Sequence, residues 1–196
     1  LWDDGEYCRV VLDGDIHTTN QQAAGLATRD NAKTFFYAFI YGAGNEKIGS
    51  IVGKDAKEGR RLRKKFLTSL PALKKLIEAV KDKAQQKGYL VGLDKRRIPI
   101  RNAHAALNTL LQSAGALLAK KSMVIMREKI EAKGWKHRAQ QVLWNHDEHQ
   151  WDCEEAIADE VGKMQVEAYQ EAGKYFNFRI PIDGEYKVGM NWADTH

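Results

Sequence analysis

Four side chains of matched spacing could together hold a nucleotide. They are Arg29, Lys33, Tyr37 and Tyr41, each four residues after the last. Side chains at i and i+4 lie on one face of an α-helix, so these four would form a single stripe. The two cations come first, near a helix N-terminus whose free N–H groups favour anions. From Arg29 to Tyr37 the stripe spans roughly 12 Å at about 1.5 Å per residue, close to the reach of a nucleoside triphosphate.

The same spacing also fits an ordinary surface helix with a cationic end and aromatic core contacts, and this alternative stays open. Phe35, Phe36, Phe39 and Ile40 would occupy the other face of the helix. Such an apolar face is enough to anchor the helix in a core under either interpretation. The pattern therefore predicts the helix more firmly than it predicts the ligand.

A second candidate site is the succession His146, Asp147 and Glu148. The flanking segments 141–144 and 149–153 are typical of short strands, so these residues should lie at the tip of a β-hairpin. Phosphoryl transfer needs divalent cations to neutralise charge and activate a hydroxyl. Mg²⁺ prefers carboxylate oxygens, and a tight hairpin could present Asp147 rigidly as a metal ligand.

Two other interpretations of this second site stay open. His146 and His149 could bind zinc, although no nearby Cys/His pair completes a tetrahedral set of ligands. The doublet of His146 and Asp147 also matches metal-dependent phosphohydrolases. In those enzymes the doublet lies on helices among further His and Asp residues, whereas here it is expected between two strands.

A polar stripe opens an otherwise small and apolar helix. It consists of Arg101, His104, Asn108 and Gln112, three or four residues apart. Amide and cationic groups could donate hydrogen bonds to the acceptors that every base pair shows in the minor groove. Such contacts would test pairing geometry and not sequence. The alternative is a capping and solvated polar face.

Positive charge is concentrated in one part of the chain. Residues 54–101 contain 16 Lys or Arg against 5 Asp or Glu, whereas the whole chain carries only +5. A basic segment attached to an acidic remainder suggests contact with a polyanion, and phosphate contacts would make binding fall steeply with salt. A solvated helical surface is the alternative.

Length and composition narrow the class of protein. The 196 residues, 43% of them apolar, suffice for one sizeable domain or two small lobes. The sequence contains no run of 18 apolar residues, the length that a transmembrane helix needs. The acidic opening Leu1-Trp2-Asp3-Asp4 does not resemble a signal peptide. Because the first residue is not Met, we expect an incomplete gene product. Cys8 and Cys153 fit unpaired thiols in a reducing cytoplasm.

The elements that would position these residues are helices mixed with antiparallel hairpins, which gives an α+β class. Residues 1–16 should be the end of one element and a short extended piece. We expect Thr28 to cap a helix over 29–41 and Ser69 to cap one with Pro71 in its first turn. The other predicted elements are helices at 54–67, 103–133 and 154–173, a hairpin at 89–100 and strands at 141–144, 149–153 and 178–182.

The segment Arg29-Asp-Asn-Ala-Lys33-Thr-Phe-Phe-Tyr37-Ala-Phe-Ile-Tyr41-Gly42 closely resembles motif B of family A DNA polymerases, and Asp15-Ile-His17-Thr resembles the segment that precedes it. The resemblance implies that His17, Arg29 and Lys33 contact the phosphates of the incoming dNTP. Tyr37 would sit beside the sugar and admit dideoxy substrates. Tyr41 would lie beside the templating base, and Gly42 would let DNA approach.

The later candidate sites resemble the same family in the same order. His146-Asp147-Glu148 on a hairpin resembles motif C, with Asp147 as metal ligand and the other two near the primer terminus. The stretch from Arg101 through His104 and Asn108 to Gln112 resembles the helix that contacts primer–template. The likeness covers essentially the whole chain, including its end at Asn191-Trp-Ala and His196. It implies that His196 lies near the active site. It implies right-hand polymerase architecture, with fingers over about 17–88 and palm over about 89–196.

By this resemblance the chain is the C-terminal part of a phage replicative DNA polymerase in the cytoplasm of a bacterial host. It would add dNTPs to a primer 3′-hydroxyl with two Mg²⁺ ions. The family's other catalytic Asp belongs to motif A, and none of Asp3, Asp4, Asp13 or Asp15 has that context. We therefore expect an upstream polymerase portion to supply it, and expect no thumb, exonuclease domain or thioredoxin site here. A non-catalytic half of a split or decayed polymerase is the main alternative, and a metal-dependent phosphohydrolase is the other.

Overall fold

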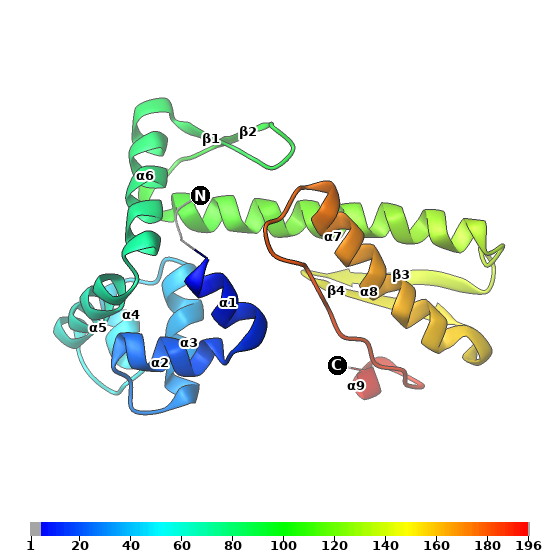
Figure 1. Cartoon of the computed structure of the whole chain (residues 1–196), viewed down its shortest axis with the longest axis horizontal. Helices are drawn as coiled ribbons and strands as arrows, with labels where there is room; N and C mark the ends of the chain where they lie inside the picture. Colours follow the sequence, from blue (N-terminus) through cyan, green and yellow to red (C-terminus); the bar gives the residue numbers. More distant parts are fainter. Residues whose placement is uncertain (1–4, 196) are drawn as a thin grey trace. The chain divides into compact units, whose positions relative to one another are not determined.

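The computed structural model describes residues 5–195, except for the side chains of residues 6 and 13. Helices dominate, and two separate two-stranded antiparallel sheets accompany them (Figure 1), which confirms the α+β class. The chain divides into two compact units, Leu1–Leu111 and Gln112–His196, and each is described by itself. Within the described residues, no helix is both long and apolar enough to cross a membrane.

The first unit opens with two helices, α1 (Glu6–Asp13) and α2 (Ile16–Ala24), so the expectation of an extended piece before residue 16 was wrong. The β-branched residues here have low helix propensity, but tertiary contacts override it. The Tyr7 hydroxyl donates to the side chain of buried Asn20 at 2.9 Å. Asp15 caps α2 by accepting from the backbone N–H groups of residues 17 and 18.

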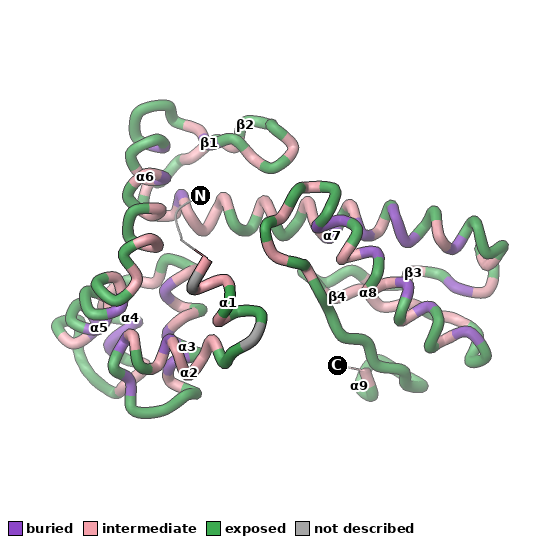
Figure 2. The backbone as a smooth tube through the Cα atoms, in the orientation of Figure 1, coloured by how far each residue is buried: buried purple, intermediate pink, exposed green. Residues whose placement is uncertain are grey.

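Helix α3 (Arg29–Ile40) forms as predicted. The Thr28 hydroxyl accepts from the Asn31 N–H at 3.1 Å, which confirms it as the N-cap. Phe35 and Phe39 are buried against Phe66, with ring centroids 5.2 and 5.1 Å from it. Figure 2 shows such buried positions in purple along α3 and the helices around it. The apolar face of α3 therefore anchors it, as the sequence indicated.

The next two helices, α4 (Asn45–Ser50) and α5 (Ala56–Ser69), pack with their backbones in close contact. A Cβ at Gly59 would overlap the carbonyl oxygen of Asn45 and lie 2.7 Å from the backbone nitrogen of Gly49. Their two backbones therefore touch where only glycine leaves room. Asp55 caps α5 by accepting from the Glu58 N–H at 3.0 Å.

Helix α6 (Pro71–Lys87) has Leu70 at its N-cap position, one residue after the predicted cap Ser69. Ser69 was predicted as that cap, but it is the last residue of α5, and its hydroxyl donates to the carbonyls of Ala23 and Lys65. A hydroxyl that donates to these carbonyls does not serve the N–H groups of the next helix. The predicted hairpin at 89–100 is confirmed as β1 (Tyr89–Val91) and β2 (Arg97–Pro99).

Helix α7 (Ala106–Ala132), preceded by the 3-10 turn Ala103–Ala105, confirms the long predicted helix and runs from the first unit into the second. The second unit then forms the hairpin of β3 (Ala139–Asn145) and β4 (Glu148–Cys153), with a bulge at Val142. The helix predicted over 154–173 is confirmed as α8 (Ala158–Tyr175) after a 3-10 turn, and α9 (Trp192–Thr195) closes the described chain. Apolar residues of α7, β3 and α8 share one core.

The strand predicted at 178–182 does not form. The segment instead lies along α8, because Ile182 packs over Gly173 and Tyr186 packs over Gly162. Pro181 has no N–H for a ladder, and small residues on a helix leave room for these side chains. The apolar side chains of this segment, such as half-buried Ile182, therefore pack against a helix instead of pairing in a sheet.

Candidate nucleotide, DNA and metal sites

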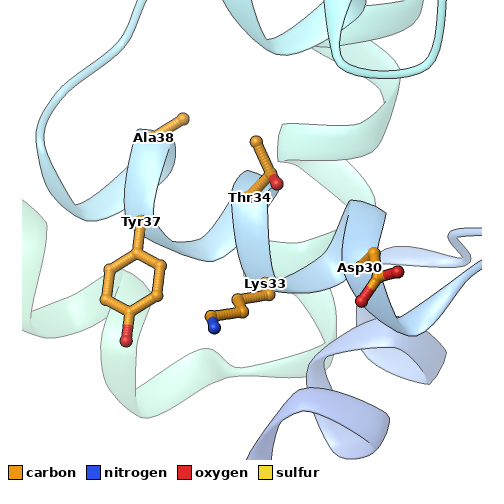
Figure 3. Close-up of a pocket in the computed structure, with 5 residues that line it drawn as sticks. All are labelled: Asp30, Lys33, Thr34, Tyr37 and Ala38. Carbon is orange, nitrogen blue, oxygen red and sulfur yellow. The ribbon is translucent and has the colours of Figure 1, made fainter. Parts of the chain in front are cut away.

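The predicted stripe on α3 lies on its exposed face. Arg29, Lys33, Tyr37 and Tyr41 are all exposed, the two tyrosines by 48% and 56%. Lys33 and Tyr37 leave the helix on the same side (Figure 3) and line an open hollow of about 580 Å³ together with Asp30. Within the described part of the chain, Lys33 forms no ion pair. A cation and an aromatic ring therefore face one hollow, which suits a ligand with phosphate and an aromatic base.

Arg29, the first residue of this stripe, forms an ion pair with Asp15. The guanidinium donates from Nε to Asp15 Oδ2 at 2.8 Å and from Nη2 to Oδ1 at 3.2 Å. The hydrogen bond from Arg29, followed by that from the Thr18 hydroxyl, holds the pKa of Asp15 well below its usual value. The carboxylate is thus fully ionised near neutral pH, and it both orients the guanidinium and offsets its charge.

His17, the third predicted phosphate ligand, lies beside the stripe. It belongs to the first turn of α2, and its ring centroid is 6.4 Å from that of Tyr37. Its Nδ1 is buried and has no hydrogen-bond partner within the described residues. The fold of the first unit thus brings His17, Arg29, Lys33 and Tyr37 to one surface.

The turn after α3 lies close to the start of the predicted DNA-contacting helix. Gly42 has a φ of 78°, a left-handed conformation that glycine adopts without strain. The nearest atom that a Cβ there would meet is the carbonyl oxygen of His104, at 3.9 Å. Tyr41 and Gly42 are therefore near His104, as a shared role at DNA would require.

Arg63 stabilises this turn through its side chain, a role that the sequence did not suggest. Its guanidinium donates to the carbonyl of Ala43 and, at 3.1 Å, to Oδ1 of Asn45, and it lies 5.2 Å from the Phe39 ring centroid. Burial lowers the pKa of Arg63, and no carboxylate pairs with it among the described residues. The helix α5 is basic throughout, so nothing in its sequence separates Arg63 from its exposed neighbours.

The polar stripe before and along α7 is divided between the two units. Arg101 and His104 are exposed in the first unit, and the Asn102 side chain accepts from the His104 N–H at 2.9 Å. Asn108 is half-buried, and its Oδ1 has no hydrogen-bond partner in the described structure. Gln112 is exposed and begins the second unit. The Asn102 cap agrees with the alternative of a capping and solvated polar face.

Asp147 occupies the tip of the β3–β4 hairpin, as predicted. The turn is two residues, and His146 has a φ of 54°, a conformation that costs free energy and is concentrated at functional sites. The Trp144 indole donates to the His146 carbonyl at 2.7 Å. The Asp147 carboxylate is exposed and accepts no hydrogen bond from the described residues, so its oxygens are available to a cation.

The Glu148 carboxylate, unlike that of Asp147, accepts hydrogen bonds from described side chains. Its Oε1 accepts from the indole of Trp192 at 3.0 Å and from the amide of Gln150. The C-terminal segment therefore reaches the hairpin through Trp192, whereas His196 lies outside the described residues. Asp3 and Asp4 also lie outside them, and so does the side chain of Asp13.

A metal at this tip would need ligands from elsewhere. Among the described residues, no group of three or more His, Cys, Asp or Glu side chains is close enough to hold one ion. A hard divalent cation binds carboxylate oxygens and retains several waters, which one exposed carboxylate such as Asp147 can join. The donor fits Mg²⁺ as one ligand of a shared site.

Comparisons with known proteins show the family of this chain. The family model for DNA polymerase family A matches residues 12–194. The DNA-directed DNA polymerases of Enterobacteria phage T3 and Escherichia phage T7 are each 43% identical over 217 aligned positions, which cover all of this chain and 30% of each relative. The chain thus spans about a third of the length of these phage relatives.

More distant proteins share the fold. The thermostable DNA polymerase I of Thermus thermophilus is 25% identical over 98% of this chain and 25% of its own length. The structure titled "POL domain of Pol1 from M. smegmatis complex with DNA primer-template and dNTP" superposes with a TM-score of 0.74 at 20% identity, covering 87% of this chain and 33% of that one. The chain belongs to DNA polymerase family A.

Proposed function

We propose that this chain forms the fingers, over about 17–88, and part of the palm, over about 89–196, of a phage-type replicative DNA polymerase. The reaction is attack of a primer 3′-hydroxyl on the α-phosphate of a dNTP, with release of pyrophosphate. One observation carries the proposal. The exposed face of α3 presents two cations, Arg29 and Lys33, followed by the Tyr37 ring, which is the order of the phosphates and the nucleoside in a dNTP. Relatives named DNA-directed DNA polymerase support it.

The nucleotide is bound along α3 by charge and then by aromatic contact. Arg29, Lys33 and His17 hold the triphosphate, and their cationic or N–H groups offset the charge that spreads over it in the transition state. Tyr37 lies against the sugar. The support is that Lys33 and Tyr37 face one hollow and that His17 is 6.4 Å, ring to ring, from Tyr37.

DNA contacts the turn and the helix that follow. Tyr41 lies beside the templating base, and Gly42 lets the strand approach. Arg101, His104, Asn108 and Gln112 donate to acceptors in the minor groove of the primer–template duplex. The proximity of Gly42 to the His104 carbonyl supports one continuous DNA surface in the first unit.

Asp147 holds Mg²⁺, and His146 and Glu148 lie near the primer terminus. Bound Mg²⁺ supplies charge neutralisation and activation of the 3′-hydroxyl. The protein contributes a rigid tip: Asp147 is exposed, follows a left-handed His146 and has a free carboxylate within the described structure. Two ions are expected, because in a two-metal site the ions together would neutralise charge on the attacking and the leaving oxygen, and Asp147 would be one of their ligands.

The second carboxylate comes from an upstream polymerase portion, in the same or a separate chain. The relatives are about three times as long as this chain. In addition, β3 and β4 form a sheet of only two strands, with Val142 63% exposed. Within the described residues the outer edge of each strand has no paired strand, and such an edge can be extended by further protein. The complete enzyme acts in the cytoplasm of a bacterial host cell.

Primer extension tests this proposal. This chain is mixed with the upstream portion of a phage-type family A polymerase, and template-dependent extension is measured with Mg²⁺. We expect extension in the mixture and its loss in Asp147→Asn, which has nearly the same shape without the charge. Extension that survives Asp147→Asn would refute the metal role. DNA and dNTP binding with no extension in any mixture would favour the non-catalytic alternative.

A further inference from the structure

The main chain of Asp147 is held by a tyrosine on another element. The Tyr169 hydroxyl, from α8, donates to the carbonyl oxygen of Asp147 at 3.0 Å. Tyr169 is half-buried, and burial raises its pKa, so the hydroxyl keeps its proton near neutral pH. This hydrogen bond ties the hairpin tip to α8, and it does not involve the Asp147 carboxylate.

The Tyr169 ring is itself fixed by a histidine of the hairpin. His149 and Tyr169 have ring centroids 5.4 Å apart at 34°, and Nε2 of His149 lies 3.5 Å from the hydroxyl. The Trp144 and His149 rings meet edge to face, with centroids 6.4 Å apart at 87°. Contacts among these three rings therefore hold the Tyr169 hydroxyl beside the hairpin tip.

A second contact from α8 holds the hairpin further from its tip. Gln165 is four residues before Tyr169, so the two side chains share one helix face. Its Oε1 accepts from the Trp151 indole at 2.9 Å. Gln165 fixes the body of β4 and Tyr169 fixes its turn, so α8 sets both the position and the direction of the hairpin.

We propose that Tyr169 is a positioning residue for catalysis, which orients the Asp147 carboxylate by holding the carbonyl of the same residue. This inference rests on the proposed role of Asp147. The tip alone would be a two-residue turn with a left-handed His146, and such a turn can exchange between peptide orientations. Fixing the carbonyl fixes the peptide plane and, with it, the direction of the Asp147 Cα–Cβ bond.

The energetic consequence should fall on the chemical step and not on nucleotide binding. Among the described residues, the partners of Tyr169 lie in the second unit, whereas α3 and its stripe belong to the first. A metal ligand displaced by even a fraction of an ångström loses catalytic geometry, because a misplacement of about 1 Å costs roughly 10²-fold in rate. Loss of the hydroxyl should therefore lower kcat and leave the KM for dNTP unchanged.

The test compares Tyr169→Phe with Tyr175→Phe. Tyr175 lies on the same helix, is 63% exposed and uses its ring against Phe176 and Lys121, with no hydrogen bond from its hydroxyl in the described structure. Amide hydrogen exchange of this chain alone is measured first. We expect exchange at residues 146–149 to rise roughly fivefold in Tyr169→Phe, as for one lost hydrogen bond. The β1–β2 hairpin and Tyr175→Phe should remain at wild-type rates, which verifies folding.

Primer extension with the upstream portion is measured second. We expect kcat to fall roughly five- to tenfold in Tyr169→Phe, as for one lost hydrogen bond whose effect is amplified at the metal ligand. The KM for dNTP should stay within about twofold, and the Mg²⁺ concentration for half-maximal rate should rise. Unchanged exchange at the tip, or unchanged kcat despite faster exchange, would overturn the proposal. An inactive wild-type mixture is a different result, which refutes the proposed function and this inference with it.

Discussion

The Asp15 carboxylate accepts two hydrogen bonds from the Arg29 guanidinium, at 2.8 and 3.2 Å, while it also caps α2 through the N–H groups of His17 and Thr18. One carboxylate therefore joins the start of α2 to Arg29 at the start of α3. A bound triphosphate would meet Arg29 already oriented, but it would compete with Asp15 for the same guanidinium.

Asp15→Asn should separate these two effects, because Asn caps a helix about as well as Asp. The cap should persist, and the negative charge beside Arg29 should disappear. We expect triphosphate affinity to rise roughly two- to fivefold, a range typical of an exposed ion pair. Titration of a dNTP monitored by fluorescence would measure it, with Asp30→Asn as a neutralised carboxylate on the same surface. Weaker binding in Asp15→Asn would mean that orientation outweighs competition.

The Asp15–Arg29 pair also predicts how stability changes with pH. The folded-state pKa of Asp15 lies below its unfolded value, so the stabilisation is complete above the unfolded pKa of about 3.9 and is lost as pH falls below it. The difference in unfolding free energy between the wild type and Asp15→Asn should stay constant at neutral pH and shrink below about pH 4. Denaturant unfolding at several pH values would measure it. A difference that changes between about pH 6 and 8 would contradict the assignment.

Gly59→Ala should strongly destabilise the first unit. A Cβ there would overlap the Asn45 carbonyl oxygen and lie 2.7 Å from the backbone of Gly49, so α4 and α5 would have to separate. We expect a loss of about 1–3 kcal/mol, the usual cost of overpacking, despite the better helix propensity of Ala. Gly115→Ala on α7, where a Cβ meets nothing within 4 Å, should instead be neutral or stabilise by about 0.5–1 kcal/mol. Similar effects of both changes would refute the backbone contact.

Arg63→Met should loosen the turn that carries Tyr41 and Gly42. It removes the hydrogen bonds to Ala43 and Asn45 and the guanidinium that lies over the Phe39 ring, but keeps an unbranched apolar side chain at this position. We expect a loss of about 1–2 kcal/mol in unfolding free energy, as for hydrogen bonds from a partly exposed charged donor. Arg60→Met, at an exposed position of the same helix, should change stability by less than about 0.5 kcal/mol. Equal effects of the two changes would show that Arg63 is an ordinary surface cation.

Local patterns in the sequence predicted the elements that carry the site. The Thr28 cap and the spacing of Arg29 and Lys33 determine α3 and its exposed face, because both depend on residues within a few turns. The hairpin of β3 and β4 follows from alternating residues around a polar turn at His146 and Asp147. These predictions required no knowledge of distant contacts.

Distant contacts account for what the sequence did not reveal. Tyr169 reaches the Asp147 carbonyl across 22 residues, and Arg63 reaches Ala43 across 20. In both pairs a side chain binds a backbone carbonyl, which leaves no pattern of residue types. The strand predicted at 178–182 was wrong for a related reason, since only the fold places Ile182 over Gly173.

Incorporation of a single nucleotide opposite each of the four template bases tests the central claim most directly. The mixture of this chain with the upstream portion is given one dNTP at a time. We expect only the complementary nucleotide to be added, and expect Arg29→Ala to lower kcat/KM roughly 10- to 100-fold, as for lost hydrogen bonds from a charged donor, while Arg60→Ala leaves it unchanged. Incorporation that ignores the template, or hydrolysis of dNTPs without a DNA product, would contradict the proposal that this chain takes part in templated DNA synthesis.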